Sequence, residues 1–268
     1  MDTEFAKLWD THHTWGKSLW VKQKHTIDES IVVIEGMFNS IYFTYAYITG
    51  NTVSVSQLQA AQELFQSLKA QPIIMLNRQN QTVHLTEFLI KNGYQFSSND
   101  SWMLYNAQYP VEKSTDIHIA DIDPNNFNDF YSVLSVVFSP FVNNEEYLTM
   151  CRNSLSTKAD NGINDFTSTF YVIYDNEVPA AGAGLFYSLE QNFAYLHNAG
   201  TLEQFRGKGY QSALIKHRIH LAQSLGINRI YSVVSQGSVS WANMIRSGCD
   251  ECQTLVGCIK PSPLPAAV

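Results

Sequence analysis

The residues best suited to binding a charged ligand form a short glycine-rich loop, Arg206-Gly-Lys-Gly, between a predicted strand and a predicted helix. Gly207 and Gly209 allow the backbone to approach a bulky anion, because glycine adopts conformations that a side chain forbids. The first amides of the following helix point outward, and the helix dipole favours negative charge there. Arg206 and Lys208 add positive charge beside those amides. The loop is therefore predicted to bind a diphosphate.

Three nucleotide-binding motifs compete for this loop. A Walker P-loop requires Gly-Lys followed by Ser or Thr, whereas Lys208 is followed by Gly209. A dinucleotide fingerprint requires a third glycine early in a parallel βαβ unit, whereas Ser212 stands at that position and the loop comes late in the chain. The motif that remains is R-x-x-G-x-G/A.

The elements that must position the loop follow from hydrophobic patterning. A strand over residues 193–201 leads into the loop and a helix over 209–225 follows it. The pattern then predicts a strand at 229–234, a helix at 240–247 and a last strand at 253–259. Upstream it predicts a strand at 117–120, helices at 124–138 and 144–155, and a hairpin of strands 170–174 and 178–186.

The first third of the chain also alternates element types. It predicts a helix over 2–20, a hairpin of strands 30–38 and 40–48 turning near Asn39, an amphipathic helix over 56–70, a strand at 73–76, a helix over 82–91 and a strand at 102–105. The polar segment 106–117 contains a proline and has no periodicity, so we place a boundary there, between domains at 1–110 and 117–260. Both parts close with a helix, a glycine and an extended segment, which suggests two copies of one fold.

Over residues 117–260 the sequence resembles the GNAT (general N-acetyltransferase) superfamily. The segment Arg206-Gly-Lys-Gly-Tyr-Gln is similar to that family's acetyl-CoA loop, except that Gln211 replaces the usual Gly or Ala and could either crowd the loop or bond to the cofactor. Residues 237–249 resemble the family's second motif, with Asn243 and Gly248 matching and Cys249 in place of Phe. The resemblance implies an α/β fold with a mixed, mostly antiparallel central sheet flanked by helices. It also suggests a tandem arrangement, in which the N-terminal part is a degenerate copy without the glycine-rich loop.

The resemblance implies that acetyl-CoA is the co-substrate. The residues that it assigns to cofactor binding lie on the strand, the loop and the second motif: Ala199, Gly200, Thr201, Arg206, Gly207, Lys208, Gly209, Tyr210, Gln211, Ser212 and Asn243.

Catalysis in the family is direct attack of an uncharged amine on the thioester, which requires a proton acceptor, a donor for the developing oxyanion and an acid for the thiolate. The Tyr that supplies the acid in many relatives is here Met244. Tyr195 and His197 alternate onto one strand face and are weak candidates for the base, since a strand His is more often structural. Two alternatives to an N-acetyltransferase stay open: a non-catalytic acyl-CoA-binding module, and a protein in which the loop is only a turn.

Composition limits the class of partner. The 268 residues are 45% hydrophobic, enough for a buried core, and carry a net charge of −7, which argues against a nucleic-acid binder. A small-molecule or peptide amine is the expected acceptor. The cysteines lack zinc-finger spacing, so reduced structural thiols are expected and no metal site. Without a visible signal peptide or a long apolar run, we expect a soluble cytoplasmic protein with no membrane partner.

Overall fold

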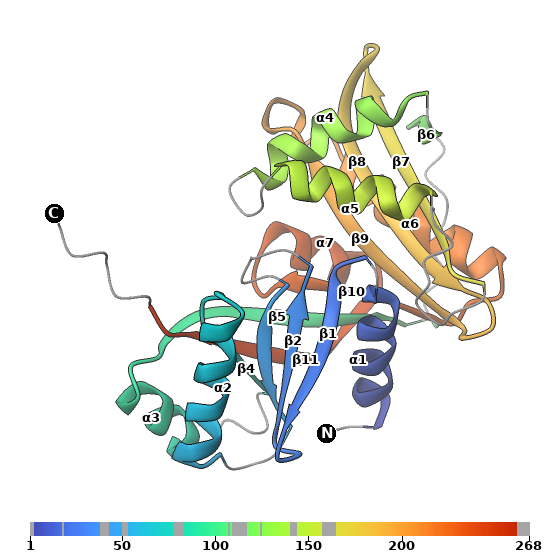
Figure 1. Cartoon of the computed structure of the whole chain (residues 1–268). Helices are drawn as coiled ribbons and strands as arrows, with labels where there is room; N and C mark the ends of the chain where they lie inside the picture. Colours follow the sequence, from blue (N-terminus) through green and yellow to red (C-terminus); the bar gives the residue numbers. More distant parts are fainter. Residues whose placement is uncertain are drawn as a thin grey trace, which may run out of the picture. The chain divides into compact units, whose positions relative to one another are not determined.

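The computed structural model describes residues 3–17, 19–37, 43–49, 53–77, 83–106, 108, 117–123, 125–139, 144–156 and 165–261. The chain divides into two compact units (Figure 1). The first consists of Met1–Ser101 with Gln253–Val268, and the second of Trp102–Cys252. The last segment of the chain therefore belongs with the first. The ranges 1–110 and 117–260 stay predictions, and most of the boundary segment 106–117 lies outside the described residues.

The first unit is a sheet with helices on both faces. Its elements in chain order are α1 (Thr3–Gly16), β1 (Val21–Ile27), β2 (Ile31–Gly36), β3 (Tyr45–Ile48), α2 (Val55–Ser67), β4 (Ile73–Asn77), α3 (Val83–Lys91) and the beginning of β5 (Gln95–Tyr105). The strand order is β1-β2-β3-β4-β11-β5, where β11 is the last strand of the chain. Of the neighbours β1–β2, β2–β3, β3–β4 and β4–β11, only β3 and β4 are parallel.

The alternation of side chains along β3 separates the two layers of this unit. The Tyr47 ring packs in a tilted arrangement against Trp9 of α1, with 4.3 Å between ring centroids. Ala46 and Ile48 lie in the apolar core that α2 and α3 cover. Ser54 begins α2 with a capping box, because its side chain accepts from the Gln57 amide while the Gln57 side chain bonds back to the Ser54 amide.

The second unit contains the predicted loop. Its elements are β6 (Ile119–Asp121), α4 (Phe127–Phe138), α5 (Asn144–Ser156), β7 (Thr167–Asp175), β8 (Val178–Ser188), β9 (Phe193–Thr201), the 3₁₀ turn η2 (Glu203–Phe205), α6 (Tyr210–Ser224), β10 (Arg229–Ser235), α7 (Val239–Arg246) and the start of β11 (Cys249–Ile259). From β10 outward the strand order is β10-β9-β8-β7-β6. Of these neighbours only β9 and β10 are parallel.

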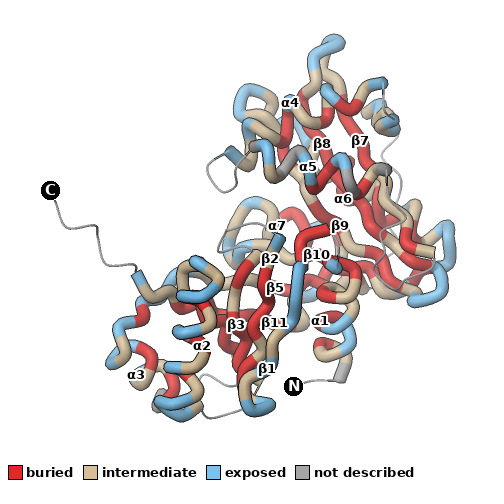
Figure 2. The backbone as a smooth tube through the Cα atoms, in the orientation of Figure 1, coloured by how far each residue is buried: buried red, intermediate tan, exposed pale blue. Residues whose placement is uncertain are grey.

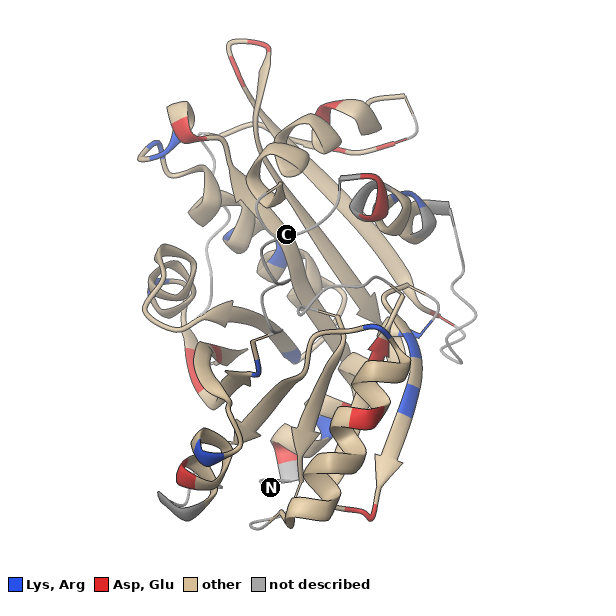
Figure 3. Ribbon diagram, turned by 60° about the vertical axis from the view of Figure 1, so that its left-hand side comes forward, with Lys and Arg blue, Asp and Glu red and all other residues tan. Residues whose placement is uncertain are grey.

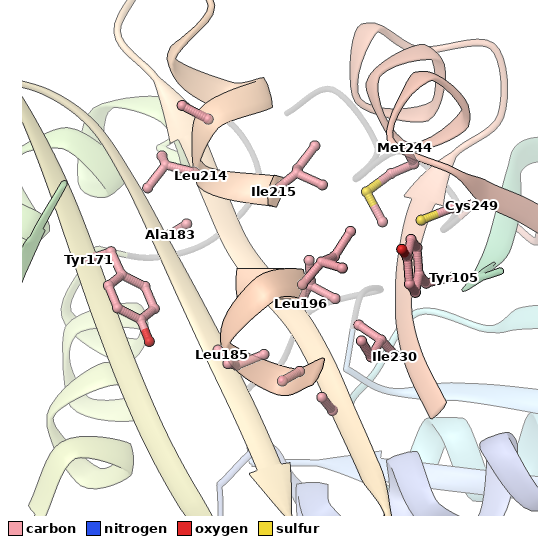
Figure 4. Close-up of a cluster of buried hydrophobic side chains, with 14 of the residues drawn as sticks. Tyr105, Tyr171, Ala183, Leu185, Leu196, Leu214, Ile215, Ile230, Met244 and Cys249 are labelled. Atoms are coloured by element: carbon pink, nitrogen blue, oxygen red, sulfur yellow. The ribbon is translucent and has the colours of Figure 1, made fainter. Parts of the chain in front are cut away.

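Two apolar layers enclose the sheet of the second unit, and its central strand β8 is buried along most of its length (Figure 2). On one face α6 packs Leu214 and Ile215 against Leu196 of β9, with Met244 and Cys249 in the same cluster (Figure 4). On the other face lies α4, where Phe130 meets the Phe170 ring edge-on at 4.8 Å. β9 therefore lies between α6 on one face of the sheet and α4 on the other.

The structure confirms the predicted fold class, a mixed and mostly antiparallel sheet flanked by helices. Two elements differ from the prediction. The helix expected over 2–20 ends at Gly16, and Val21–Ile27 is the edge strand β1, whose exposed Lys and Gln side chains gave no hydrophobic alternation. The strand expected at 102–105 is the end of β5, which begins at Gln95 with a mostly polar segment. The turn expected near Asn39 lies outside the described residues, as does the tail at 262–268.

The order of elements recurs in the two units. In each, an antiparallel pair of strands (β2 and β3, or β8 and β9) is followed by a helix, then by a strand parallel to the second of the pair (β4, or β10), then by another helix and a long strand. The pairing of β3 with β4, at Ala46↔Ile74, thus corresponds to the pairing of β9 with β10, at Phe193↔Arg229.

The buried imidazole of His13 makes the stability of the first unit depend on pH. Its Nδ1 donates to the Trp9 carbonyl at 2.6 Å, so the neutral ring accepts at Nε2 from the Tyr45 hydroxyl. Burial lowers the pKa of His13 from 6.5 to about 4. The unfolded chain therefore binds more protons between these two values, and stability falls as pH drops through that window.

We expect His13 to contribute about 3 kcal/mol to this loss of unfolding free energy between pH 6.5 and 4. Denaturant unfolding at stepped pH measures it. The variant His13→Gln should have a shallower slope than the wild type, whereas the exposed control His220→Gln should retain the full slope. An unchanged slope in His13→Gln would contradict the assignment.

Candidate functional site

The strands β9 and β10 separate partway along their length. Their parallel pairing consists of Phe193↔Arg229, Ala194↔Ile230 and Tyr195↔Tyr231, after which no further pair forms between them. The Ser232 hydroxyl donates to the Leu196 carbonyl at 2.8 Å just past the last pair. Residues 196–201 of β9 therefore have an edge that β10 does not cover, and the turn η2 connects this strand to the glycine-rich loop.

A bulge lies on the same stretch of β9. The register with β8 shifts between Gly182↔Gly200 and Gly184↔His197, so that Asn198 and Ala199 have no partner residue in β8. Asn198 has a φ of +46°, a conformation costly for most residues but tolerated by Asn. A Cβ on Gly184 would lie 2.6 Å from the His197 ring, so the bulge needs a glycine opposite it.

The loop has the geometry that its sequence predicted. After η2, Arg206 is extended, and Gly207 and Gly209 have φ values of +82° and +81°. A Cβ built on either glycine would meet no atom within 4 Å. The glycines are thus required by backbone conformation, and the space beside them is open.

The helix α6 begins with unpaired amides. Its N-cap is Gly209, which has no side chain to cap them. The first bond into the helix runs from the Ala213 amide to the Gly209 carbonyl at 3.0 Å. The amides of Tyr210, Gln211 and Ser212 precede it, as helix geometry requires. The predicted cluster of outward amides is therefore present at the open side of the loop.

One of the two predicted cations is already paired. The Lys208 ammonium contacts the carboxylate of Asp175, at the end of β7, and the Tyr210 hydroxyl donates to that carboxylate at 2.9 Å. The bond from Lys208 holds the pKa of Asp175 below its usual range, and Asp175 in turn raises the pKa of Lys208. Asp175 anchors the loop through Lys208 and Tyr210, which leaves the exposed Arg206 as the loop cation without an ion pair among the described residues.

Gln211 points toward α7. Its Nε2 donates to the Ser240 hydroxyl at 2.9 Å, and its Oε1 accepts from the Asn243 Nδ2 at 2.7 Å. The Arg246 guanidinium donates to the remaining oxygen of Asn243. Gln211 therefore neither crowds the loop nor extends into the open space, and it joins the starts of two helices.

The candidate bases Tyr195 and His197 lie side by side on β9, on the face away from Leu196. Tyr195 stacks on Tyr231 at 4.9 Å, and the His197 ring lies 3.5 Å from that of Phe186. Burial, followed by the Arg218 charge, lowers the pKa of His197 well below its usual range, so the ring is neutral. Its Nε2 is buried without a hydrogen-bond partner.

The remaining strand positions are tightly packed. A Cβ on Gly200 would lie 2.8 Å from Val137 of α4, so only glycine fits there. The Thr201 hydroxyl is buried and unpartnered, although the Thr201 residue pairs with Ala181 in the ladder. Met244, at the position where relatives carry Tyr, is 3% exposed and belongs to the α6 core (Figure 4).

Sequence reasoning missed two residues at this site. Asp175 was read only as part of a hairpin turn, and its position against the loop depends on long-range strand pairing. Arg218 lies on α6 at 1% exposure, and its Nη1 donates to the carbonyls of Gly184 and His197 at 2.8 and 3.2 Å. The sequence position of Arg218 did not indicate a role at the site, because an Arg on a helix is usually exposed.

Comparison with known proteins agrees with this geometry. Residues 128–243 match the family model described as Acetyltransferase (GNAT) family, which spans α4 to α7. No curated protein matches the chain in sequence. This match confirms the resemblance of the second unit to the GNAT family.

Solved structures share the fold over nearly the whole chain. A GCN5-related N-acetyltransferase from Kribbella flavida has a TM-score of 0.66 at 12% identity, over 98% of this chain and 96% of its own. A functionally unknown conserved protein from Staphylococcus epidermidis ATCC 12228 has 0.67 at 14%, over 91% and 96%. A tandem GNAT protein from the clavulanic acid biosynthesis pathway has 0.56 at 9%, over 87% and 79%. At these identities the likeness concerns the fold.

None of the helices in the described part of the chain has the length and apolar character needed to cross a bilayer. In the same part of the chain, no three His, Cys, Asp or Glu side chains are grouped as metal ligands would be. Lys and Arg residues occur singly or in short groups along the described part of the ribbon (Figure 3).

The bonds of Gln211 lead to a prediction about stability. Replacing Gln211 with Ala removes its bonds to Ser240 and Asn243, so we expect a loss of about 1–2 kcal/mol of unfolding free energy. Denaturant unfolding measures it. The control Gln204→Ala, at an exposed position in η2, should cost less than about 0.5 kcal/mol. Equal stability of the two variants would show that Gln211 does not join the helices.

Proposed function

We propose that the second unit is an N-acetyltransferase that moves an acetyl group from acetyl-CoA to an amine of a small molecule or peptide. The observation that carries the proposal is the uncovered edge of β9, which is followed, after the short turn η2, by a loop of open glycines and unpaired amides. An extended chain ending in a diphosphate matches both parts, since it can pair along a strand edge and place its charges at a helix start.

The residues at the loop fit the diphosphate. The space beside Gly207 and Gly209 accommodates the bulky phosphates, and the amides of Tyr210, Gln211 and Ser212 are oriented to donate to them. Charge for this contact comes from Arg206, because Lys208 is engaged by Asp175. We propose that Lys208 contributes by fixing the loop and by sharing its charge between Asp175 and the ligand.

The pantetheine arm is proposed to lie along residues 196–201, paired with backbone groups of Ala199, Gly200 and Thr201. Tight packing of Gly200 under Val137 keeps this stretch flat against α4. Asn243 is a proposed contact for the same arm, and it must exchange one of its bonds to Gln211 or Arg246 to make that contact.

When bound, acetyl-CoA supplies an activated thioester. The amine nitrogen forms a bond to the carbonyl carbon, and the carbon–sulfur bond breaks with release of the thiolate. A backbone amide at the bulge donates to the carbonyl oxygen as negative charge develops on it. Neither Met244 nor the enclosed His197 ring is placed to exchange protons with substrate. We propose that solvent takes the proton from the amine and protonates the thiolate, with Tyr195 as the nearest alternative.

We propose that the first unit is a degenerate GNAT-like copy that supports the catalytic one or shapes the acceptor cleft. The recurring element order and the fold match over nearly the whole chain support this. No described residues of the first unit form a counterpart to the Arg206 loop. A cytoplasmic location accompanies the proposal, and nucleic acids and membranes are not proposed partners.

The second candidate function is an acyl-CoA-binding module without catalysis. Two observations favour it specifically: Met244 occupies the position of the usual acid, and His197 is neutral and enclosed. Both candidates predict cofactor binding, and only the first predicts turnover.

Cofactor binding is tested by the pair Gly209→Asp and Gly209→Asn. Both residues tolerate the left-handed conformation and are good N-caps, so both variants should fold. Only Asp places a carboxylate against the diphosphate. In the wild type, acetyl-CoA at about 100 times its Kd should stabilise the protein by about 2.7 kcal/mol.

We expect Gly209→Asp to lower acetyl-CoA affinity at least about tenfold more than Gly209→Asn, from the repulsion of like charges at close range. Isothermal calorimetry measures both. Arg206→Ala should weaken binding as well. Wild-type affinity in Gly209→Asp would move the site elsewhere.

Turnover is tested by thiol release from acetyl-CoA in the presence of a panel of small amines and peptide N-termini. The N-acetyltransferase predicts release that depends on one amine class and is lost in Gly209→Asp. Binding of acetyl-CoA without amine-dependent release would support the binding module instead.

A further inference from the structure

Arg218 is a buried cation without an acidic partner. The side chain is 1% exposed, and no carboxylate among the described residues forms an ion pair with it. Burial lowers the pKa of Arg218 to about 10, so the guanidinium keeps its charge at neutral pH. A buried charge is costly unless hydrogen bonds compensate it. The hydrogen bonds of Arg218 go to backbone carbonyls, which indicates that its charge stabilises the backbone conformation there.

The guanidinium joins two strands at the bulge. Its Nη1 donates to the Gly184 carbonyl of β8 at 2.8 Å and to the His197 carbonyl of β9 at 3.2 Å. Its Nε donates to the Leu214 carbonyl one turn earlier on α6. Gly184 and His197 are the pair at which the register shifts. Arg218 therefore ties α6 to the irregular point of the β8–β9 ladder.

The direction of the next amide follows from these bonds. The Leu196 carbonyl accepts from Ser232, so it points toward β10. The His197 carbonyl points the opposite way, toward β8, because it shares a donor with Gly184. In a planar trans peptide the N–H lies opposite the C=O. The Asn198 N–H therefore points toward β10, beyond the last β9–β10 pair.

We propose that Arg218 is a positioning residue that orients and polarises the Asn198 amide as the donor to the thioester carbonyl oxygen. This inference rests on the proposed acetyltransferase function. A cation bound to the carbonyl of a peptide strengthens its N–H as a donor, because hydrogen bonds in series polarise one another. The buried positive charge also favours the negative charge that develops on the oxygen, since a low dielectric strengthens the interaction.

The first measurement needs no ligand. The ¹H–¹⁵N spectrum of the free full-length protein is compared among wild type, Arg218→Lys, Arg218→Gln and Arg218→Met. We expect the resonance of the Asn198 amide proton to move upfield in Arg218→Met and Arg218→Gln. In Arg218→Lys, which keeps the charge, the resonance should stay near its wild-type position. The control Lys216→Met, on the same helix, should leave the Asn198 resonance unchanged.

The second measurement uses acetyl-CoA labelled with ¹³C at the carbonyl. In the wild type, binding should lower the carbonyl stretching frequency. Arg218→Met should lose most of that frequency shift, and Arg218→Lys should retain more of it than Arg218→Gln. Affinity for CoA without the acetyl group should fall less than affinity for acetyl-CoA in Arg218→Met, because the diphosphate binds at the loop. For an amine that is turned over, kcat should fall about tenfold or more in Arg218→Met, and less than the 10²–10³ of removing an oxyanion donor.

The outcomes separate the two proposals. If the wild type binds no acetyl-CoA, the proposed function fails, and the free-protein spectrum still decides whether Arg218 acts on Asn198. If the wild type binds but the Asn198 resonance and the carbonyl frequency in Arg218→Met match the wild type, the inference is overturned. If Arg218→Lys, Arg218→Gln and Arg218→Met all fail to fold, the role of Arg218 is structural only, and the inference is also overturned.

Discussion

The second unit depends on one break in strand pairing. Two neighbouring parallel strands normally satisfy each other's backbone groups, yet β9 and β10 pair at three positions and then part. Buried amides and carbonyls along the separated stretch must find other partners. Ser232 serves one carbonyl and Arg218 another, while the bulge at Asn198 turns the strand away from its β8 register. The site consists of the backbone groups that these arrangements leave for a ligand.

The charges around the loop are balanced within the protein. Lys208 is held by Asp175, which also binds the Tyr210 hydroxyl, so the start of α6 is tied to the end of β7. This ion pair keeps the loop in one conformation, and it leaves less positive charge available to a ligand. Gln211 and Asn243 do the same for α6 and α7. The loop is thereby preorganised on two rigid supports, which lowers the ordering entropy that a ligand must offset.

The sequence was most informative where function depends on local conformation. Gly207 and Gly209 could be predicted because left-handed φ values favour glycine at those positions whatever surrounds them. Most helices and strands followed from periodicity, whereas β1 was missed because its exposed side chains are polar. For Gln211 the sequence left open whether the side chain would crowd the loop or bond to a ligand. The structure shows neither, because the side chain is hydrogen-bonded to Ser240 of α7.

The residues that could not be predicted depend on contacts between distant parts of the chain. Asp175 meets Lys208 across 33 positions, and Arg218 meets Gly184 across 34. The end of the β9–β10 pairing is likewise a property of tertiary packing, since both segments read as ordinary strands. A propensity scale describes each residue alone and contains none of this information.

The last strand has a consequence for how the chain is made. Residues Leu255–Ile259 of β11 pair with β4 and complete the sheet of the unit that contains the N-terminus. During synthesis residues 1–101 leave the ribosome before β11, because all of the second unit lies between them in the chain. One side of β4 therefore stays unpaired until Leu255–Ile259 have also emerged.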